Sequence, residues 1–236
     1  MPKVRLYCLP HAGGSASTYL NWGKFLGQDI ELVSIELAGR GKRNNIPLYQ
    51  DMEHAIDDIF SLIATNLSEI PYAILGHSMG TIIAYELARE IHSHNLPPPV
   101  HMFFSGRYPP YLKGFSKKIN ILPDDEFLYA FAKLGGLSNE VLQNKELIDY
   151  ILPIMRSDCR IVEEYNHAKP RFVVNCDITV LSGNNDPTAT VQELEQWSHC
   201  TRAKCHFYSF DDGHFFIHKY RNEVITLIKE TLLEEE

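Results

Sequence analysis

The sequence lacks the basic surface that a nucleic-acid-binding protein needs. Its 236 residues contain 22 Lys and Arg against 30 Asp and Glu, giving a formal net charge of −8. Binding a phosphate backbone requires positive charge, so nucleic acid is excluded as the expected partner. Long apolar runs are lacking too. Each is broken by charge, glycine or proline within about ten residues, too short for a membrane span, and we expect no contact with a membrane.

Cysteines are few, and their spacing matches no disulfide framework: Cys8, Cys159, Cys176, Cys200 and Cys205. The odd number leaves one unpaired, and Met1 begins no secretory signal pattern. Free thiols in a reducing cytoplasm are therefore expected. Residues that commonly bind zinc are close together only between His199 and His206, where Cys200 and Cys205 also lie. This stretch lacks a second ligand pair with knuckle spacing, and residues 205 and 206 would point to opposite faces of a strand, so we expect no metal.

The sequence is organised around Tyr72–Tyr85, which reads Y-A-I-L-G-H-S-M-G-T-I-I-A-Y. An apolar strand pattern leads through G-H-S-M-G into a helical pattern, as in a nucleophile elbow. A serine on such a turn projects from the backbone, and the turn requires small residues on either side, here Gly76 and Gly80. We interpret Ser78 as a nucleophile, although G-x-S-x-G alone also occurs in ordinary glycine turns.

A loop of small residues follows the first predicted strand. Residues 3–9 have strand character, and P-H-A-G-G-S follows directly. In hydrolases with a nucleophile elbow, the oxyanion hole takes one N–H from such a loop and one from the residue after the nucleophile. The predicted donors are Ala12, with Gly13 close behind, and Met79. His11 is as consistent with packing or loop bracing as with a chemical role.

A serine needs an imidazole base and a carboxylate that orients it, in the chain order Ser, acid, His. Ser78, Asp186 and His214 have this order, and each follows a predicted strand. The alternatives fit less well. For the acid, Asp177 begins its strand, and Asp211 and Asp212 are too near His214 in sequence to reach its far nitrogen easily. For the base, three other histidines do not lie in a glycine turn after a strand: His199, His206 and His218.

The turn after the second predicted strand, residues 30–37, carries three cations in A-G-R-G-K-R. It lies at the edge of the sheet where open α/β folds bind ligands. Arg40 or Arg43 could meet a phosphate of the substrate there, but solvated turn charges are the commoner outcome.

Strands and helices alternate along the chain, which predicts one α/β domain over residues 1–236 with a mostly parallel sheet and helices on both faces. Helices are expected over 18–26, 51–67 and 223–233, and further strands over 100–105, 177–182 and 205–210. Two helical patterns, 123–136 and 145–156, interrupt the alternation. This insertion, about 110–165, is too long for a connection and predicts a lid. Its apolar residues should mostly pack on one another, with a minority lining an acyl pocket.

With these residues in view, the sequence resembles the type II (external, editing) thioesterases of non-ribosomal peptide and polyketide synthesis, which have the α/β-hydrolase fold. The resemblance spans nearly the whole chain. One departure is Ala38, where the family usually has proline. The motifs that carry it are P-H-A-G-G-S-A at 10–16, E-L-A-G-R-G at 36–41, G-H-S-M-G at 76–80, S-G-R at 105–107, L-P-D-D-E-F-L at 122–128, L-G-G-L at 134–137, L-P-I-M-R-S-D at 152–158, D-P at 186–187 and D-G-H-F-F at 212–216.

The resemblance implies a substrate and a partner. The substrate would be an acyl group in thioester linkage to the phosphopantetheine arm of an acyl or peptidyl carrier protein, and the task would be removal of stalled or wrongly loaded groups. No cofactor is implied, and a monomer is expected because no pairing surface is evident. Two other readings stay open. One is a carboxylesterase or acyltransferase of the same fold, and the other is a catalytically silent module that binds carrier proteins.

Overall fold

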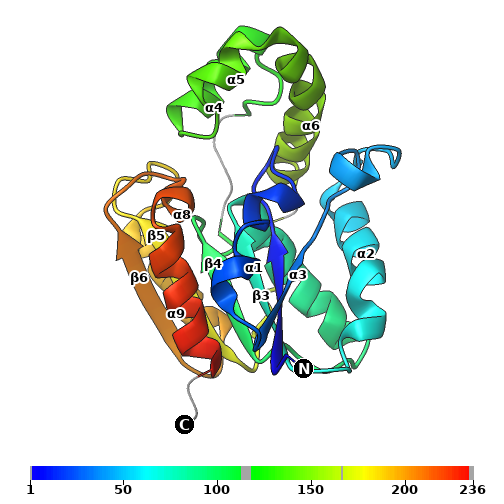
Figure 1. Cartoon of the computed structure of the whole chain (residues 1–236), viewed down its shortest axis with the longest axis vertical. Coiled ribbons are helices and arrows are strands. Elements are labelled where there is room, and N and C mark those ends of the chain that lie inside the picture. Colours follow the sequence, from blue (N-terminus) through cyan, green and yellow to red (C-terminus); the bar gives the residue numbers. More distant parts are fainter. Residues whose placement is uncertain (1, 113–117, 166, 234–236) are drawn as a thin grey trace.

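A computed structural model describes residues 2–112, 118–165 and 167–233 of the chain. Its centre is a six-stranded sheet in which all five neighbouring pairs are parallel (Figure 1). The order across the sheet is β2-β1-β3-β4-β5-β6. The strands are β1 Val4–Leu9, β2 Ile30–Ser34, β3 Tyr72–His77, β4 His101–Ser105, β5 Asp177–Gly183 and β6 Cys205–Phe210. Because the strands are parallel, the loops after them meet at one edge, as predicted.

Helices cover both faces of this sheet. Alternate residues of each inner strand point to opposite faces, so Ile74 packs with α2 and α3, while Leu75 packs with α1 and α9. The helices outside the insertion are η1 Ala16–Tyr19, α1 Gly23–Leu26, η2 Gly41–Arg43, α2 Met52–Ile63, η3 Ala64–Asn66, α3 Met79–Ser93, α7 Val191–Glu195, η4 Gln196–Cys200, α8 Phe216–Lys219 and α9 Arg221–Leu233. Within the described ranges, none of the helices is long and apolar enough to cross a membrane.

Outside the insertion, the second strand and the first helix differ most from their predicted ranges. The second strand ends at Ser34, three residues early, because its neighbour β1 ends at Leu9 before a proline. The predicted helix over residues 18–26 is two short turns, η1 and α1. Between them the N–H groups of Leu20 and Trp22 donate to carbonyls three residues back, at 3.2 and 2.9 Å, in place of the four-residue spacing of an α-helix. The cap at Asp51 is as predicted, since its carboxylate accepts the His54 N–H.

In its described residues, the insertion between β4 and β5 forms three helices above the edge where the strands end (Figure 1). They are α4 Asp124–Lys133, α5 Asn139–Gln143 and α6 Lys145–Glu163. Residues 113–117, which belong to the predicted insertion, lie outside the described residues. Helix α6 is seven residues longer than predicted and continues through Pro153. The insertion has a small core of its own, formed by Phe127, Phe131, Met155 and Cys159.

Candidate active site

Ser78 lies at the sharp turn from β3 into α3, in a backbone conformation that is rare for a residue with a side chain. Its φ is 55° and its ψ is −112°. A Cβ at Gly76 would lie 2.0 Å from the carbonyl oxygen of Gly80, and one at Gly80 would lie 2.2 Å from that of Leu9. Glycine is therefore required on both sides, as predicted. Thr81 braces the turn, because its hydroxyl donates to the carbonyls of Gly76 and Ser105 at 2.8 and 2.9 Å.

Three residues from separate loops meet at this turn. His214 Nε2 lies 2.9 Å from Ser78 Oγ, and its Nδ1 lies 2.7 Å from Asp186 Oδ2. Thr188 donates to Asp186 Oδ1 from its N–H at 2.8 Å and from its hydroxyl at 2.7 Å. Burial alone would raise the pKa of Asp186, but the hydrogen bonds from His214 and Thr188 outweigh it and lower that pKa. The arrangement can move a proton from the serine hydroxyl to an imidazole held by a carboxylate.

The competing carboxylates lie elsewhere. Asp177 is at the opposite end of β5, where it accepts the Lys204 N–H at 2.9 Å. Asp211 accepts from the Asn185 side-chain amide at 3.3 Å, and Asp212 accepts the Gly213 N–H at 2.9 Å. Of the four acids considered, only Asp186 is bonded to His214.

The other histidines of interest also have different surroundings. His218 stacks on Phe215 with ring centroids 5.7 Å apart, and His199 lies in η4. His206 in β6 faces Asp177 at 3.9 Å. His11 packs edge-on against Phe215 with ring centroids 4.9 Å apart, and burial and the neighbouring His218, His214 and Arg40 lower its pKa to about 3. His11 is thus a neutral packing residue of the cavity wall.

The two main-chain amides predicted to form the oxyanion hole belong to residues that line the same cavity as Ser78. Met79 is the first residue of α3, and Ala12 lies in the loop after β1; both line the cavity at Ser78. Within the described part of the chain, neither amide donates a hydrogen bond to a protein group. The Gly13 amide is already used, because it donates to Asp158 Oδ2 at 2.7 Å. Of the two loop amides that the sequence offers as oxyanion donors, Ala12 and Gly13, the Ala12 N–H is therefore the available one.

The expectation of solvated charges in the cationic turn is wrong for Arg40, whereas Lys42 is exposed as expected. Arg40 is neither solvated nor free to bind a phosphate, because it is only 2% exposed and forms a bidentate ion pair with Asp158 of α6 at 2.6 and 2.7 Å. Arg43 is likewise paired, with Asp58 of α2 at 2.7 and 2.8 Å. Guanidinium groups match carboxylates in a planar fork, so both charges hold elements of the fold together.

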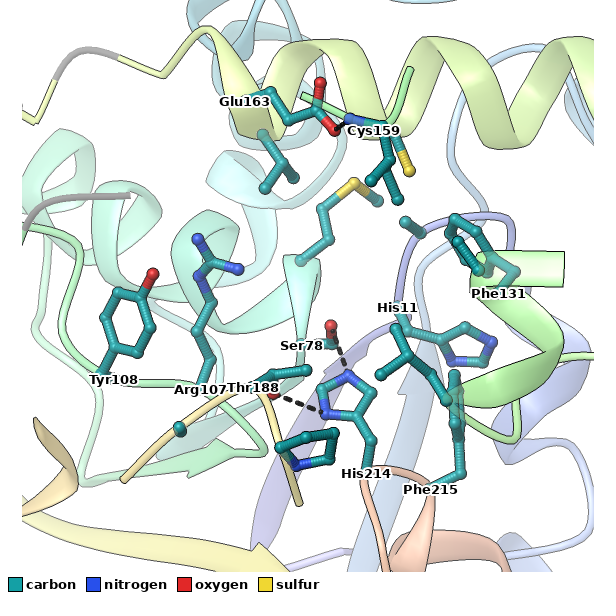
Figure 2. Close-up of a pocket in the computed structure, with 18 of the residues that line it drawn as sticks. His11, Ser78, Arg107, Tyr108, Phe131, Cys159, Glu163, Thr188, His214 and Phe215 are labelled. Carbon is teal, nitrogen blue, oxygen red and sulfur yellow. Dashed lines mark hydrogen bonds between the residues drawn. The ribbon is translucent and has the colours of Figure 1, made fainter. Parts of the chain in front are cut away.

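A cavity of about 680 Å³ opens at Ser78, between the sheet edge and the helical insertion. Figure 2 shows Ser78, Thr188 and His214 on one side, with Phe131, Cys159 and Glu163 of the insertion opposite. Phe131 and Leu134, which belong to the predicted helical pattern 123–136, line the cavity. The insertion also contributes Ile119, Ala130, Cys159 and Val162. Most of this wall is apolar, which suits an acyl chain.

A family model described as "Thioesterase domain" matches residues 4–232. The chain belongs to the thioesterase family. The family predicted from the motifs and the predicted thioester hydrolase activity are thereby confirmed. The gramicidin S biosynthesis protein GrsT of Aneurinibacillus migulanus is 37% identical over 227 residues, which cover 94% of this thioesterase and 86% of GrsT. The thioesterase PikA5 of Streptomyces venezuelae is 31% identical over 98% of this chain and 81% of its own.

The solved structures agree with the fold of this thioesterase. The crystal structure of ClbQ from the colibactin NRPS/PKS pathway superposes with a TM-score of 0.93 at 35% identity, covering 98% of this chain and 97% of ClbQ. The predicted α/β-hydrolase fold is confirmed by this likeness and by the parallel sheet with helices on both faces.

Two residues of the thioesterase site escaped sequence reasoning. Thr188 holds Asp186, and the signal for it was local, because an aspartate commonly accepts the N–H two residues later. Asp158 lies 145 residues from its partner Gly13 and 118 from its partner Arg40. It ends the insertion motif L-P-I-M-R-S-D at 152–158, but no local pattern indicates so distant a contact.

Proposed function

We propose that this thioesterase hydrolyses acyl groups bound as thioesters to the phosphopantetheine arm of carrier proteins. Its task is to release stalled or wrongly loaded groups from a non-ribosomal peptide or polyketide synthase. Support comes from relatives whose names connect them with such pathways, GrsT and ClbQ among them. The observation that carries the proposal is the largely apolar cavity that meets Ser78 and His214 beneath the insertion.

The first half of the reaction is acylation of Ser78. His214 Nε2, 2.9 Å from Ser78 Oγ, takes the hydroxyl proton as the oxygen bonds to the thioester carbonyl carbon. Negative charge moves to the carbonyl oxygen, which accepts hydrogen bonds from the Ala12 and Met79 amides. The carbon–sulfur bond then breaks, and the pantetheine sulfur leaves with the proton from His214. Asp186 keeps Nδ1 protonated and stabilises the imidazolium.

Deacylation repeats the cycle with water. His214 takes a proton from water as its oxygen attacks the acyl carbon, and the same two amides hold the oxyanion. The bond to Ser78 Oγ breaks, the serine recovers its proton from His214, and the free acid departs. A thiol is a better leaving group than an amine, so the site needs less acid assistance than a peptidase site.

The helical insertion acts in this proposal as a lid that shapes the acyl pocket and part of the docking surface for the carrier protein. Residues 1–236 then work as a single α/β-hydrolase domain. The cytoplasmic location and the monomeric state stay predictions from the sequence.

The first test is mass spectrometry of acetyl-loaded and longer-acyl-loaded carrier proteins after incubation with the enzyme. Wild type should return them to the free-thiol form and Ser78→Ala should not. Ser198→Ala, at an exposed position in η4, is the matched control and should behave as wild type. Asp186→Asn and His214→Ala should lose most of the rate.

Three outcomes would contradict the proposal. Hydrolysis of p-nitrophenyl esters without release from any carrier protein would make the protein a carboxylesterase. Transfer of the acyl group to an added amine or alcohol in preference to water would make it an acyltransferase. Full function of Ser78→Ala in a producing cell would make it a binding module.

A further inference from the structure

Asp158 is a buried carboxylate that the proposed reaction does not use. It lies on α6 and is 1% exposed. Its Oδ2 accepts the Gly13 N–H at 2.7 Å and an Arg40 N–H at 2.6 Å, while Oδ1 accepts a second Arg40 N–H at 2.7 Å. A carboxylate removed from water in this way is stable only because it is paired and hydrogen-bonded. The helical insertion is thus joined, through one side chain, to the loop that carries Ala12.

The loop itself is a tight turn from His11 to Gly14. The Gly14 N–H donates to the His11 carbonyl at 2.9 Å, and Gly13 at the third position has a φ of +75°. Turns with that conformation at the third position favour glycine. The His11 carbonyl and the Ala12 N–H belong to one planar peptide group, so the bond from Gly14 also fixes the direction of the Ala12 N–H.

Asp158 and Arg40 hold two further peptide groups, one inside this turn and one directly after it. Asp158 binds the N–H of the peptide between Ala12 and Gly13, and Arg40 donates to the Gly14 carbonyl at 2.9 Å. Arg40 also donates to the Ala38 carbonyl at 3.3 Å, which anchors it to the core. Both peptide groups that flank Ala12 are thereby bonded. Ala12 lines the cavity, and its own N–H has no hydrogen-bond partner among the described residues.

Helix α6 also touches the loop through Met155, one turn before Asp158. A Cβ at Gly13 would lie 2.6 Å from Met155 Cγ, so the helix rests directly against the glycine. The two contacts fix both the distance of α6 from the loop and the orientation of the peptide that Asp158 binds.

We infer that Asp158 is a positioning residue of the oxyanion hole: with Arg40 it holds the turn so that the Ala12 N–H meets the oxyanion only when α6 is seated against the loop. The inference rests on the proposed role of Ala12. Loss of the carboxylate leaves the Arg40 charge buried without its partner and frees the Gly13 peptide to rotate. The transition state, which carries the oxyanion, should therefore be affected more than binding of the substrate.

The test compares Asp158→Asn with Asp124→Asn. Asp124 belongs to the same insertion and pairs with Arg156 at 2.6 Å, but it is exposed and does not touch the loop. Active sites are counted with a fluorophosphonate that labels Ser78. We then measure kcat and KM for an acyl-pantetheine thioester, the Ki of a trifluoromethyl ketone that forms a tetrahedral adduct with Ser78, and the Ki of the carboxylic acid product.

For Asp158→Asn we expect kcat per active site to fall on the order of 10²-fold, the range for loss of one oxyanion donor. The Ki of the ketone should rise by a similar factor, while KM and the Ki of the product stay within about twofold. Asp124→Asn should match wild type in all four quantities. Two results for Asp158→Asn would show that Asp158 has only a structural role. One is an equal rise in the Ki of the ketone and of the product, and the other is an unchanged kcat per active site with a lower melting temperature.

A second variant covers a failure of Asp158→Asn to fold. Arg40→Lys keeps a positive charge beside Asp158 but loses the two-pronged pairing, and it should show the same selective loss in kcat and ketone affinity to a smaller degree. Unchanged kinetics in a folded Arg40→Lys would overturn the inference. Failure of the proposed function looks different, because the fluorophosphonate would then not label Ser78 in wild type, or wild type would cleave esters and no thioester.

Discussion

Replacing Asp186 with asparagine should nearly abolish turnover while leaving the fold intact. The Thr188 N–H can only donate, and it lies 2.8 Å from Oδ1, so the oxygen of the new amide will take that position. The amide nitrogen then occupies the position of Oδ2, 2.7 Å from His214 Nδ1, as a donor. It forces Nδ1 to accept and leaves the proton on Nε2. Ser78 would then face a nitrogen that cannot take its proton.

The size of this effect follows from the geometry. A histidine held in the wrong tautomer costs about 10⁴ in kcat, or about 5 kcal/mol of transition-state stabilisation. The assay is steady-state hydrolysis of an acyl-pantetheine thioester, with thermal unfolding to verify the fold. Asp212→Asn is the matched control, because its carboxylate binds only the neighbouring Gly213 N–H near the same loop, and it should keep at least half the wild-type rate. An Asp186→Asn variant with more than a tenth of the wild-type rate would refute the assignment of the acid.

Three further predictions concern stability. Burial lowers the pKa of His101 to about 4 against the opposing charge of Asp177, so the unfolded chain binds its proton first as the pH falls below 6.5. This group alone should lower the free energy of unfolding by about 2 kcal/mol between pH 7 and 5. When that free energy is measured by urea unfolding at several pH values, it should fall less toward pH 5 in His101→Gln than in wild type. An equal fall in both proteins would contradict the prediction. Gly76→Ala should lose about 3 kcal/mol or more because its Cβ would meet a main-chain oxygen at 2.0 Å, whereas Gly23→Ala, with its nearest atom at 3.7 Å, should change stability by at most about 1 kcal/mol by calorimetry. Trp197→Ala should cost about 4 kcal/mol in urea unfolding, because the indole is fully buried and stacked on Phe104 with centroids 3.8 Å apart; a loss below about 1 kcal/mol would be inconsistent.

The parts of the site that lie close to strand ends were predictable. Ser78, Asp186 and His214 each follow a strand with a clear apolar pattern, and parallel strands bring such loops to one edge. The glycines flanking Ser78 were also predictable, because a strand-to-helix turn leaves no room for a Cβ there. In these cases a local rule and the global topology point to the same place.

The role of the cationic turn was not predictable from local patterns. A basic residue in a glycine-rich turn is usually solvated, and only the tertiary fold brings α6 over Arg40 and buries the pair. Local patterns also do not show which apolar residues of the insertion line the cavity and which pack in its core. Phe131 and Phe127 are four residues apart on one helix, yet of the two only Phe131 borders the cavity. Phe127 is fully buried in the core of the insertion, with the Arg156 guanidinium 4.5 Å from its ring centroid.

The thiol of Cys159 is a site for covalent labelling inside the cavity. This cysteine lines the cavity and is 6% exposed, and burial raises the pKa of its thiol well above the usual range. A protonated thiol is a poor nucleophile, so it does not compete with Ser78 for the acyl group by exchange. It can still react slowly with a thiosulfonate that enters the cavity. In a background with Cys176→Ser and Cys205→Ser, which removes the two cysteines that are more exposed than Cys159, the rate of that labelling measures how accessible the cavity is to a small molecule.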